Sequence, residues 1–260
     1  MKEFIWDFWR FFHSIVIAVR RDVPFRRRDV IEVMIRQVRF GGQQGFRLIG
    51  IAALILGFGT VAQSAAQLQK LGGVDALAPL LVGVLVRDLG PLVTVLIVVS
   101  RSVSAVASEL ASMKANGEID ALKGCGVSPL SYLVVPRILG GAAAIFLLAT
   151  HFLMISLVAG FIFSRFFVAM PVNKFFHDIL MSVTPIDFVI FIVKTFGLGI
   201  MVFGIACYSG LRTRGTSFEI PQATTGAVVR SFIFAFAFQI VISSFYYISL
   251  LSARSGGGLF

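Results

Sequence analysis

The chain has 260 residues, of which 57% are hydrophobic and only 14% are charged. Soluble domains carry a charge on roughly a quarter of their residues, so this composition excludes an ordinary soluble domain and indicates an integral membrane protein. The net charge of +10 is therefore attributed to basic residues at the cytoplasmic ends of membrane helices and near anionic lipid head groups, and not to nucleic-acid binding.

The N-terminal segment, residues 1–47, combines aromatic residues with a basic cluster. Its apolar run is interrupted by Asp7, Arg10 and His13, so it is too short to span a bilayer and does not resemble a cleavable signal peptide. Aromatic rings beside arginines are typical of a helix that lies in the membrane interface. An ordinary amphipathic helix with solvated arginines is the alternative.

Five apolar stretches are long enough to cross a bilayer, which takes about 20 helical residues. The first is rich in Gly, Ala and Ser, which let helix backbones approach closely, and its second half carries Gln63 and Gln67, which suggest a face towards a polar cavity or the outer surface. A short surface helix is expected within the loop 164–184. The predicted spans are 48–67, 80–100, 138–163, 186–209 and 228–251.

The distribution of Lys and Arg predicts the topology. Basic residues concentrate in 1–47, in the connection 101–137 and around 212–230, and are sparse in the other connections. The positive-inside rule then places the N-terminus in the cytoplasm and the C-terminus outside, as an odd number of spans requires. We expect one domain over 1–260, with a transmembrane core at 48–251 and a flexible, Gly-rich tail at 252–260.

Arg87, Asp88 and Lys194 are charged residues in the interior of predicted spans, several residues away from the span ends. Charges in a membrane are costly unless they are paired or face a cavity, so all three are functional candidates. Arg87 and Asp88 point about 100° apart on a helix and need not pair with each other; alternatively both reach the outer head groups. Lys194 is a candidate for contact with a lipid phosphate or an acidic neighbour. Its alternatives are a packing role beside Asp187, or snorkelling to the surface.

A polar stretch between the second and third spans predicts a short amphipathic helix over 111–123, closed by Gly and Pro. It is too short and too charged to span the membrane. Its size suits a helix that docks into a cytosolic partner. The fold class is thus an all-α integral membrane protein, with an N-terminal interfacial helix, five transmembrane helices and a short cytoplasmic coupling helix between spans two and three.

The stretch that contains this helix also carries a family resemblance. The run from Leu85 to Arg137, which begins LVRDLGPLVTVLIVVSRS, resembles the MlaE/YrbE permease family, the membrane subunits of ABC transporters associated with MCE proteins. Two shorter blocks agree with that family: Lys194-Thr195-Phe196-Gly197 in the fourth span, and Gly215 with Ala223–Val229 at the start of the last. The resemblance covers roughly residues 30–250.

The resemblance implies a homodimer in the bacterial inner membrane that moves phospholipids or similar lipids to or from a periplasmic MCE-domain protein and maintains outer-membrane lipid asymmetry. It also implies two cytosolic ATPase subunits and, in some members, a STAS-domain protein. The lipid cavity would lie at the dimer interface. The implied ATPase-coupling residues are Glu109, Met113, Lys114, Glu118, Asp120 and Lys123, and the cavity candidates are Arg47, Arg87, Asp88 and Lys194.

The sequence does not predict an enzyme. It contains no Walker A pattern, so ATP is expected to be bound by a partner subunit, and the chain itself is expected to need no cofactor. Its three histidines are scattered, which predicts no metal site. An ion-coupled secondary transporter is one alternative, although acidic residues near spans are few and no internal repeat is evident. A membrane-embedded lipid-modifying enzyme is another, although no nucleophile lies beside a base.

Overall fold

The computed structural model describes residues 6, 10, 11, 13, 14, 27–70, 77–168, 171–213, 215, 216 and 218–256. These residues form helices joined by short turns, and no strand occurs among them. Five helical stretches are long and apolar enough to cross a membrane, which confirms the predicted all-α membrane fold. They are Gly45–Leu68, Pro79–Ala115, Leu130–Phe166, Pro185–Leu211 and Glu219–Ile248.

The second span is one unbroken helix made of five segments. They are α3 (Leu77–Leu81), the π-helix η3 (Val82–Leu89), α4 (Gly90–Val98), the π-helix η4 (Val99–Val103) and α5 (Ser104–Ala115). The other elements are α2 (Arg27–Lys70), α6 (Glu118–Gly124), η5 (Leu130–Val134), α7 (Val135–Phe163), η6 (Ser164–Val168), α8 (Val172–Ser182), α9 (Pro185–Leu211) and α10 (Glu219–Gly256). Helix α8 confirms the short helix expected within 164–184.

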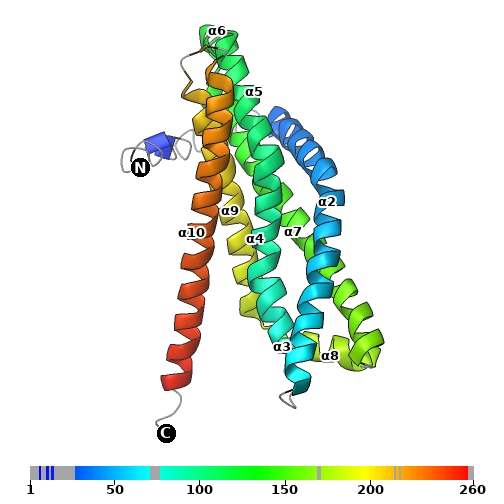
Figure 1. The fold of residues 1–260 in the computed structure, drawn as a ribbon. Helices are drawn as coiled ribbons and strands as arrows, with labels where there is room; N and C mark the ends of the chain where they lie inside the picture. The colour runs from blue at the N-terminus through cyan, green and yellow to red at the C-terminus, as the bar shows by residue number, and fades with distance from the viewer. Residues whose placement is uncertain are drawn as a thin grey trace.

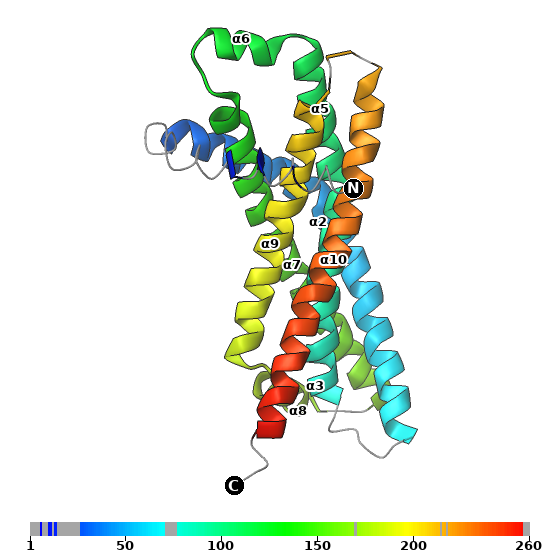
Figure 2. The ribbon, with the colours of Figure 1, turned by 90° about the vertical axis from the view of Figure 1, so that its left-hand side faces the viewer.

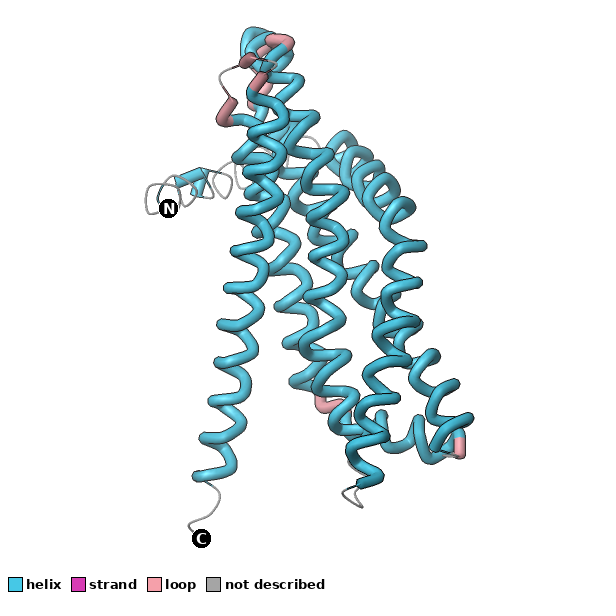
Figure 3. The backbone as a smooth tube through the Cα atoms, in the orientation of Figure 1, coloured by secondary structure: helices cyan, strands magenta, loops and turns pink. Residues whose placement is uncertain are grey.

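The long helices form a bundle around α7 and α9. Helix α7 packs against α2 and α9, and α9 packs in turn against α5 and α10. In Figure 1, α6 lies at the top of the bundle, and α8 and the end of α10 lie at the bottom. Figure 3 shows that the described loops gather at these two ends, while the middle of the bundle is helical throughout.

Close packing of α2 on α7 depends on small residues, as the composition of the first span predicts. A Cβ atom added at Gly57 would lie 2.5 Å from the carbonyl oxygen of Ser156, so the two backbones are in direct contact. Gly59, two residues on, faces open space. Van der Waals contact of this kind is what holds helices together in lipid, where burial of apolar surface contributes little.

The ends of the chain differ in part from the sequence prediction. Most of residues 1–26, where the interfacial helix is predicted, lies outside the described residues. Helix α2 runs without a break across the predicted boundary at residue 47, and its bluer first part lies crosswise to the bundle in Figure 2. Helix α10 continues past the predicted end of the last span at residue 251 and ends at Gly256; Ala and Arg within residues 252–256 favour helix. Residues 257–260 lie outside the described part.

The predicted coupling helix over 111–123 is also corrected. Residues up to Ala115 belong to α5, and the separate helix α6 begins at Glu118. Between them Gly117 adopts a left-handed conformation with φ of 74°, which only glycine adopts without strain. The Asn116-Gly117 pair therefore ends the long helix, and α6 leaves it as an independent element.

Candidate functional site

The site begins with a defect in the backbone of the second span. Pro91 has no N–H group, so the carbonyl of Arg87, four residues earlier, lacks its usual helical donor. The preceding turns are wide, and the N–H of Gly90 bonds to the carbonyl of Leu85, five residues back. Lys194 on α9 compensates for the missing donor: its Nζ atom donates to the Arg87 carbonyl oxygen at 2.6 Å. Such π-helical turns are frequent at functional sites.

The Arg87 side chain forms a two-pronged ion pair with Asp187. Its Nε and NH2 atoms lie 2.7 and 3.0 Å from the two carboxylate oxygens. Asp187 is fully buried and also accepts hydrogen bonds from the backbone N–H and the hydroxyl of Thr184. The same carboxylate thus closes the capping box that starts α9 and neutralises an arginine of the second span.

Lys194 pairs with Asp88. Its Nζ atom donates to Asp88 Oδ1 at 3.0 Å and to Ser243 Oγ at 2.8 Å, in addition to the Arg87 carbonyl. An ammonium group has three donors, and all three are used inside the protein. The side chain is 1% exposed, so its charge is enclosed by the second span, α9 and α10.

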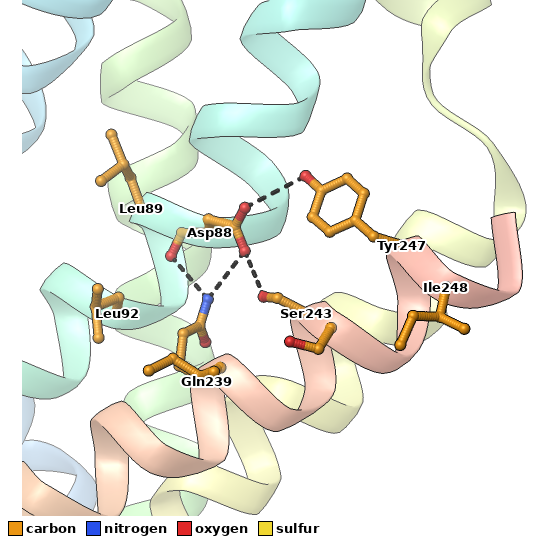
Figure 4. A pocket seen from close by; sticks show the side chains of 9 residues that line it. Asp88, Leu89, Leu92, Gln239, Ser243, Tyr247 and Ile248 are labelled. Carbon is orange, nitrogen blue, oxygen red and sulfur yellow. Dashed lines mark hydrogen bonds between the residues drawn. The ribbon is translucent and has the colours of Figure 1, made fainter. Parts of the chain in front are cut away.

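Helix α10 completes this arrangement with neutral polar groups. Gln239 donates to the backbone carbonyl and to Oδ1 of Asp88 at 3.3 and 3.2 Å, and Ser243 donates to the same Oδ1 at 2.7 Å (Figure 4). Tyr247 donates to Asp88 Oδ2 at 3.5 Å. The neighbouring Tyr246 ring lies 4.9 Å from the guanidinium of Arg87.

The four charged residues are called the charge cluster below: Arg87, Asp88, Asp187 and Lys194. Two positive and two negative groups cancel, and each ion pair joins the second span to α9. An unpaired charge is expensive in a membrane, whereas a paired one holds two helices in a fixed register. The charge cluster is therefore compatible with the membrane interior only as a complete set.

A groove runs beside the charge cluster, between the second span and α10. Its volume is about 560 Å³, and its walls include Leu92, Ile240 and Ile248. Asp88 is the member of the charge cluster that lines it, and 34% of the Asp88 side chain is exposed. A second groove of about 490 Å³ is lined by Gln63 and Gln67 of α2, which agrees with the polar face predicted there.

Three of the four cavity candidates come together in the structure, and one does not. Arg87, Asp88 and Lys194 meet, but Lys194 pairs with Asp88 instead of Asp187 and does not snorkel. Arg47 is exposed on α2, a helix that contributes nothing to the charge cluster.

The polar residues of α10 were not among the predicted site residues. A signal was nevertheless present, because Gln239, Ser243 and Tyr247 recur every four residues in an apolar span and so share one helix face. Such a polar stripe predicts a partner on another helix, which here is Asp88.

The six predicted coupling residues divide into two groups. Those on α5 bond to or pack against other helices: the exposed Glu109 pairs with Arg137 of α7 at 2.8 Å, and Lys114 donates to the Leu211 carbonyl of α9 at 3.3 Å. Met113 is partly buried against the core.

Those on α6 face outwards. Glu118, Asp120 and Lys123 are exposed, while Ile119 is buried and anchors the helix. Lys123 donates to Asp120 at 2.8 Å, and this hydrogen bond lowers the pKa of the Asp120 carboxyl. Acids in the first turn and a base in the last turn also suit the helix dipole.

Comparison with known proteins places the chain in a family. The family described as Permease MlaE matches residues 34–245. The chain belongs to the MlaE permease family. The matched range includes the whole charge cluster and α6, and the match confirms the family resemblance of the 85–137 stretch.

Relatives of this MlaE-family chain are named as ABC transporter permeases. A probable ABC transporter permease protein of Rickettsia prowazekii is 25% identical over 84% of both chains. One of Synechocystis is 26% identical over 88% of this chain and 84% of its own length. The chloroplast protein trigalactosyldiacylglycerol 1 of Arabidopsis thaliana is 28% identical over 69% of this chain, which spans about half (49%) of that protein.

Proposed function

We propose that this chain is the non-catalytic, membrane-spanning subunit of an ABC transporter that moves phospholipids between the inner membrane and a periplasmic MCE-domain protein. It would act as a homodimer with two cytosolic ATPase subunits, which bind ATP, and in some systems with a STAS-domain subunit. The observation that carries the proposal is the single continuous helix that joins the groove beside Asp88 to the exposed helix α6.

The length of that helix supports a mechanical role. Its 37 residues measure roughly 55 Å at 1.5 Å per residue, against about 30 Å for the hydrocarbon core of a bilayer. One end therefore projects well beyond the lipid, where α6 is attached. When ATP closes the ATPases, movement of α6 would shift this helix and change the shape of the groove.

The proposed orientation places α6 in the cytoplasm and α8 with the end of α10 in the periplasm. Basic residues of the 101–137 connection lie at the α6 end, in agreement with the positive-inside rule. Native Cys125 is exposed beside α6, and Cys207 is buried. A membrane-impermeant maleimide should label Cys125 in inside-out vesicles and not in intact spheroplasts. Labelling from the periplasmic side would reject the orientation and the coupling role together.

Charge reversal on α6 tests the coupling role. We expect Glu118→Lys and Asp120→Lys each to lower lipid-dependent ATP hydrolysis by the assembled transporter several-fold, because both side chains are exposed and make only local contacts. Folding should be unaffected, as monitored by size-exclusion profile and thermal unfolding. Asn173→Lys, at an exposed position of α8 at the other end of the bundle, is the control. Full coupling in both α6 variants would refute this assignment.

A further inference from the structure

The two oxygens of the Asp88 carboxylate have different environments. Oδ1 accepts hydrogen bonds from Lys194, Ser243 and Gln239 at 2.7 to 3.2 Å. Among the described residues, Oδ2 accepts one long hydrogen bond, from Tyr247 at 3.5 Å. A carboxylate oxygen has two lone pairs and accepts two or more strong hydrogen bonds. The acceptor capacity that remains free on this residue is therefore on Oδ2.

No basic side chain of the described residues lines the groove opposite this free acceptor capacity. Lys194 is enclosed with all its donors used, and Arg87 is engaged with Asp187. Neither basic residue lines the groove, whereas Asp88 does. The remaining walls combine Leu and Ile side chains with the polar groups of Gln239, Ser243, Ser244 and Tyr247. Gln239 and Ser243 already donate to Asp88 Oδ1. The polar end of the groove thus offers a carboxylate and hydroxyls, and its body offers apolar contact.

Resting on the proposed function, we infer that this groove selects glycerophospholipids whose head group carries a primary ammonium. The ammonium would donate to Asp88 Oδ2, with the hydroxyl oxygens of Ser244 and Tyr247 as further acceptors, while acyl chains lie along Leu92 and Ile240. A charge-assisted hydrogen bond of this kind is about twice as strong as a neutral one, and the low dielectric of the membrane strengthens it.

Competing head groups fit this site less well. An anionic phosphate or glycerol phosphate would bring its charge towards the Asp88 carboxylate, and like charges repel strongly where water is excluded. A choline group carries the right charge but has no N–H donor. Quaternary ammonium groups are held by cages of several aromatic rings, and among the residues that the structure describes Tyr247 is the one aromatic residue that lines the groove.

Lipid competition on the purified full-length chain tests the inference. The probe is phosphatidylethanolamine with a fluorophore on its acyl chain, and the competitors are phosphatidylethanolamine, phosphatidylcholine and phosphatidylglycerol with matched acyl chains. We expect phosphatidylethanolamine to displace the probe at a concentration about tenfold lower than the other two. Asp88→Asn should reduce this preference to about twofold or less.

A second variant keeps the test independent of the charge cluster, because Asp88→Asn leaves Lys194 without its ion-pair partner. Ser244→Lys adds an ammonium to the groove without altering that pair. The new ammonium should pair with the Asp88 carboxylate and so abolish the preference for phosphatidylethanolamine. Gln63→Leu, in the other groove, should retain it. Lipid-dependent ATP hydrolysis by the assembled transporter is measured in parallel as the readout of the proposed function.

The outcomes separate the two proposals. Equal displacement by all three lipids, or strongest displacement by phosphatidylglycerol, overturns the head-group inference. If ATP hydrolysis still depends on lipid in that case, the proposed transporter function is upheld. A preference that survives both Asp88→Asn and Ser244→Lys overturns the head-group inference as well. A further outcome is that no lipid displaces the probe, while two copies that carry Ile240→Cys form a disulfide with each other. This result would show that a second copy fills the groove, and it would overturn the head-group inference. Loss of all lipid binding and lipid-dependent hydrolysis would reject both proposals.

Discussion

The charge cluster and helix α6 use the same residue types in opposite ways. In the charge cluster, each charged side chain finds its partner on another helix, and Asp187 and Lys194 are almost completely buried. On α6, Asp120 and Lys123 form an ion pair between positions three residues apart, and both side chains remain exposed. The first arrangement fixes helices relative to one another, and the second leaves a charged surface free for another protein.

The comparison makes a quantitative prediction, because removing one member of a buried pair leaves the other charge uncompensated. The largest effect is expected for Asp187→Ala, which leaves Arg87 without its ion-pair partner and removes the capping box of α9. We expect the free energy of unfolding to fall by about 3–5 kcal/mol, measured by denaturant unfolding in detergent with circular dichroism. Asp187→Asn, which retains a partial cap, should lose less. Wild-type stability in the alanine variant would contradict a structural role for the pair.

The next largest effect is expected at the backbone contact between α2 and α7, where no charged group is involved. Gly57→Ala would place a methyl group against the backbone of Ser156 and should destabilise the bundle by about 1–3 kcal/mol. Gly59→Ala is its matched control in the same helix, because no atom of the described residues lies within 4 Å of its Cβ position. The control should be neutral or stabilising by up to about 1 kcal/mol, since alanine favours helix. Equal effects of the two substitutions would argue against the close packing of α2 on α7.

A double-mutant cycle sharpens the comparison within the charge cluster itself. Asp88→Asn and Lys194→Met each remove one side of an ion pair that is 3.0 Å long. We expect a coupling energy of about 1–2 kcal/mol from the unfolding free energies of the two single variants and the double variant. Additive effects would mean that Lys194 is held mainly by the Arg87 carbonyl and Ser243.

The smallest effect is expected on α6. The Lys123 hydrogen bond lowers the pKa of Asp120, so the pair contributes stability above the ordinary carboxyl pKa and loses it as the pH falls through the lowered value. Because both side chains are exposed, solvent screens this contribution. Asp120→Asn should leave the thermal unfolding midpoint unchanged at pH 7. A clear decrease would place α6 among the structural elements of the bundle.

Much of this architecture could be predicted from the sequence, because a membrane imposes simple rules. Apolar length identified the five spans, and the cost of intramembrane charge singled out Arg87, Asp88 and Lys194. The pairing could not be predicted, since it depends on how the helices are rotated about their axes. Asp187 was one of the alternatives considered for Lys194 on the same helix, but its position at the start of α9 places it beside Arg87.

The break between α5 and α6 has a similar explanation. The hydrophobic pattern continues across Asn116 and Gly117, and only the left-handed backbone at Gly117 ends the helix. An Asn-Gly pair is a strong turn signal, so this helix boundary could have been predicted from the sequence. The amphipathic pattern on both sides of the pair favoured one continuous helix instead.

The bond from Lys194 to the Arg87 carbonyl has a consequence for motion during transport. A side chain of α9 replaces a backbone bond of the second span, so sliding of one helix along the other would open that bond as well as both ion pairs. The second span and α9 should therefore move together as one rigid unit. Helix α10 contributes uncharged hydroxyl and amide groups to the charge cluster, so movement of this wall of the groove would break hydrogen bonds to Asp88 and Lys194 and leave both ion pairs in place.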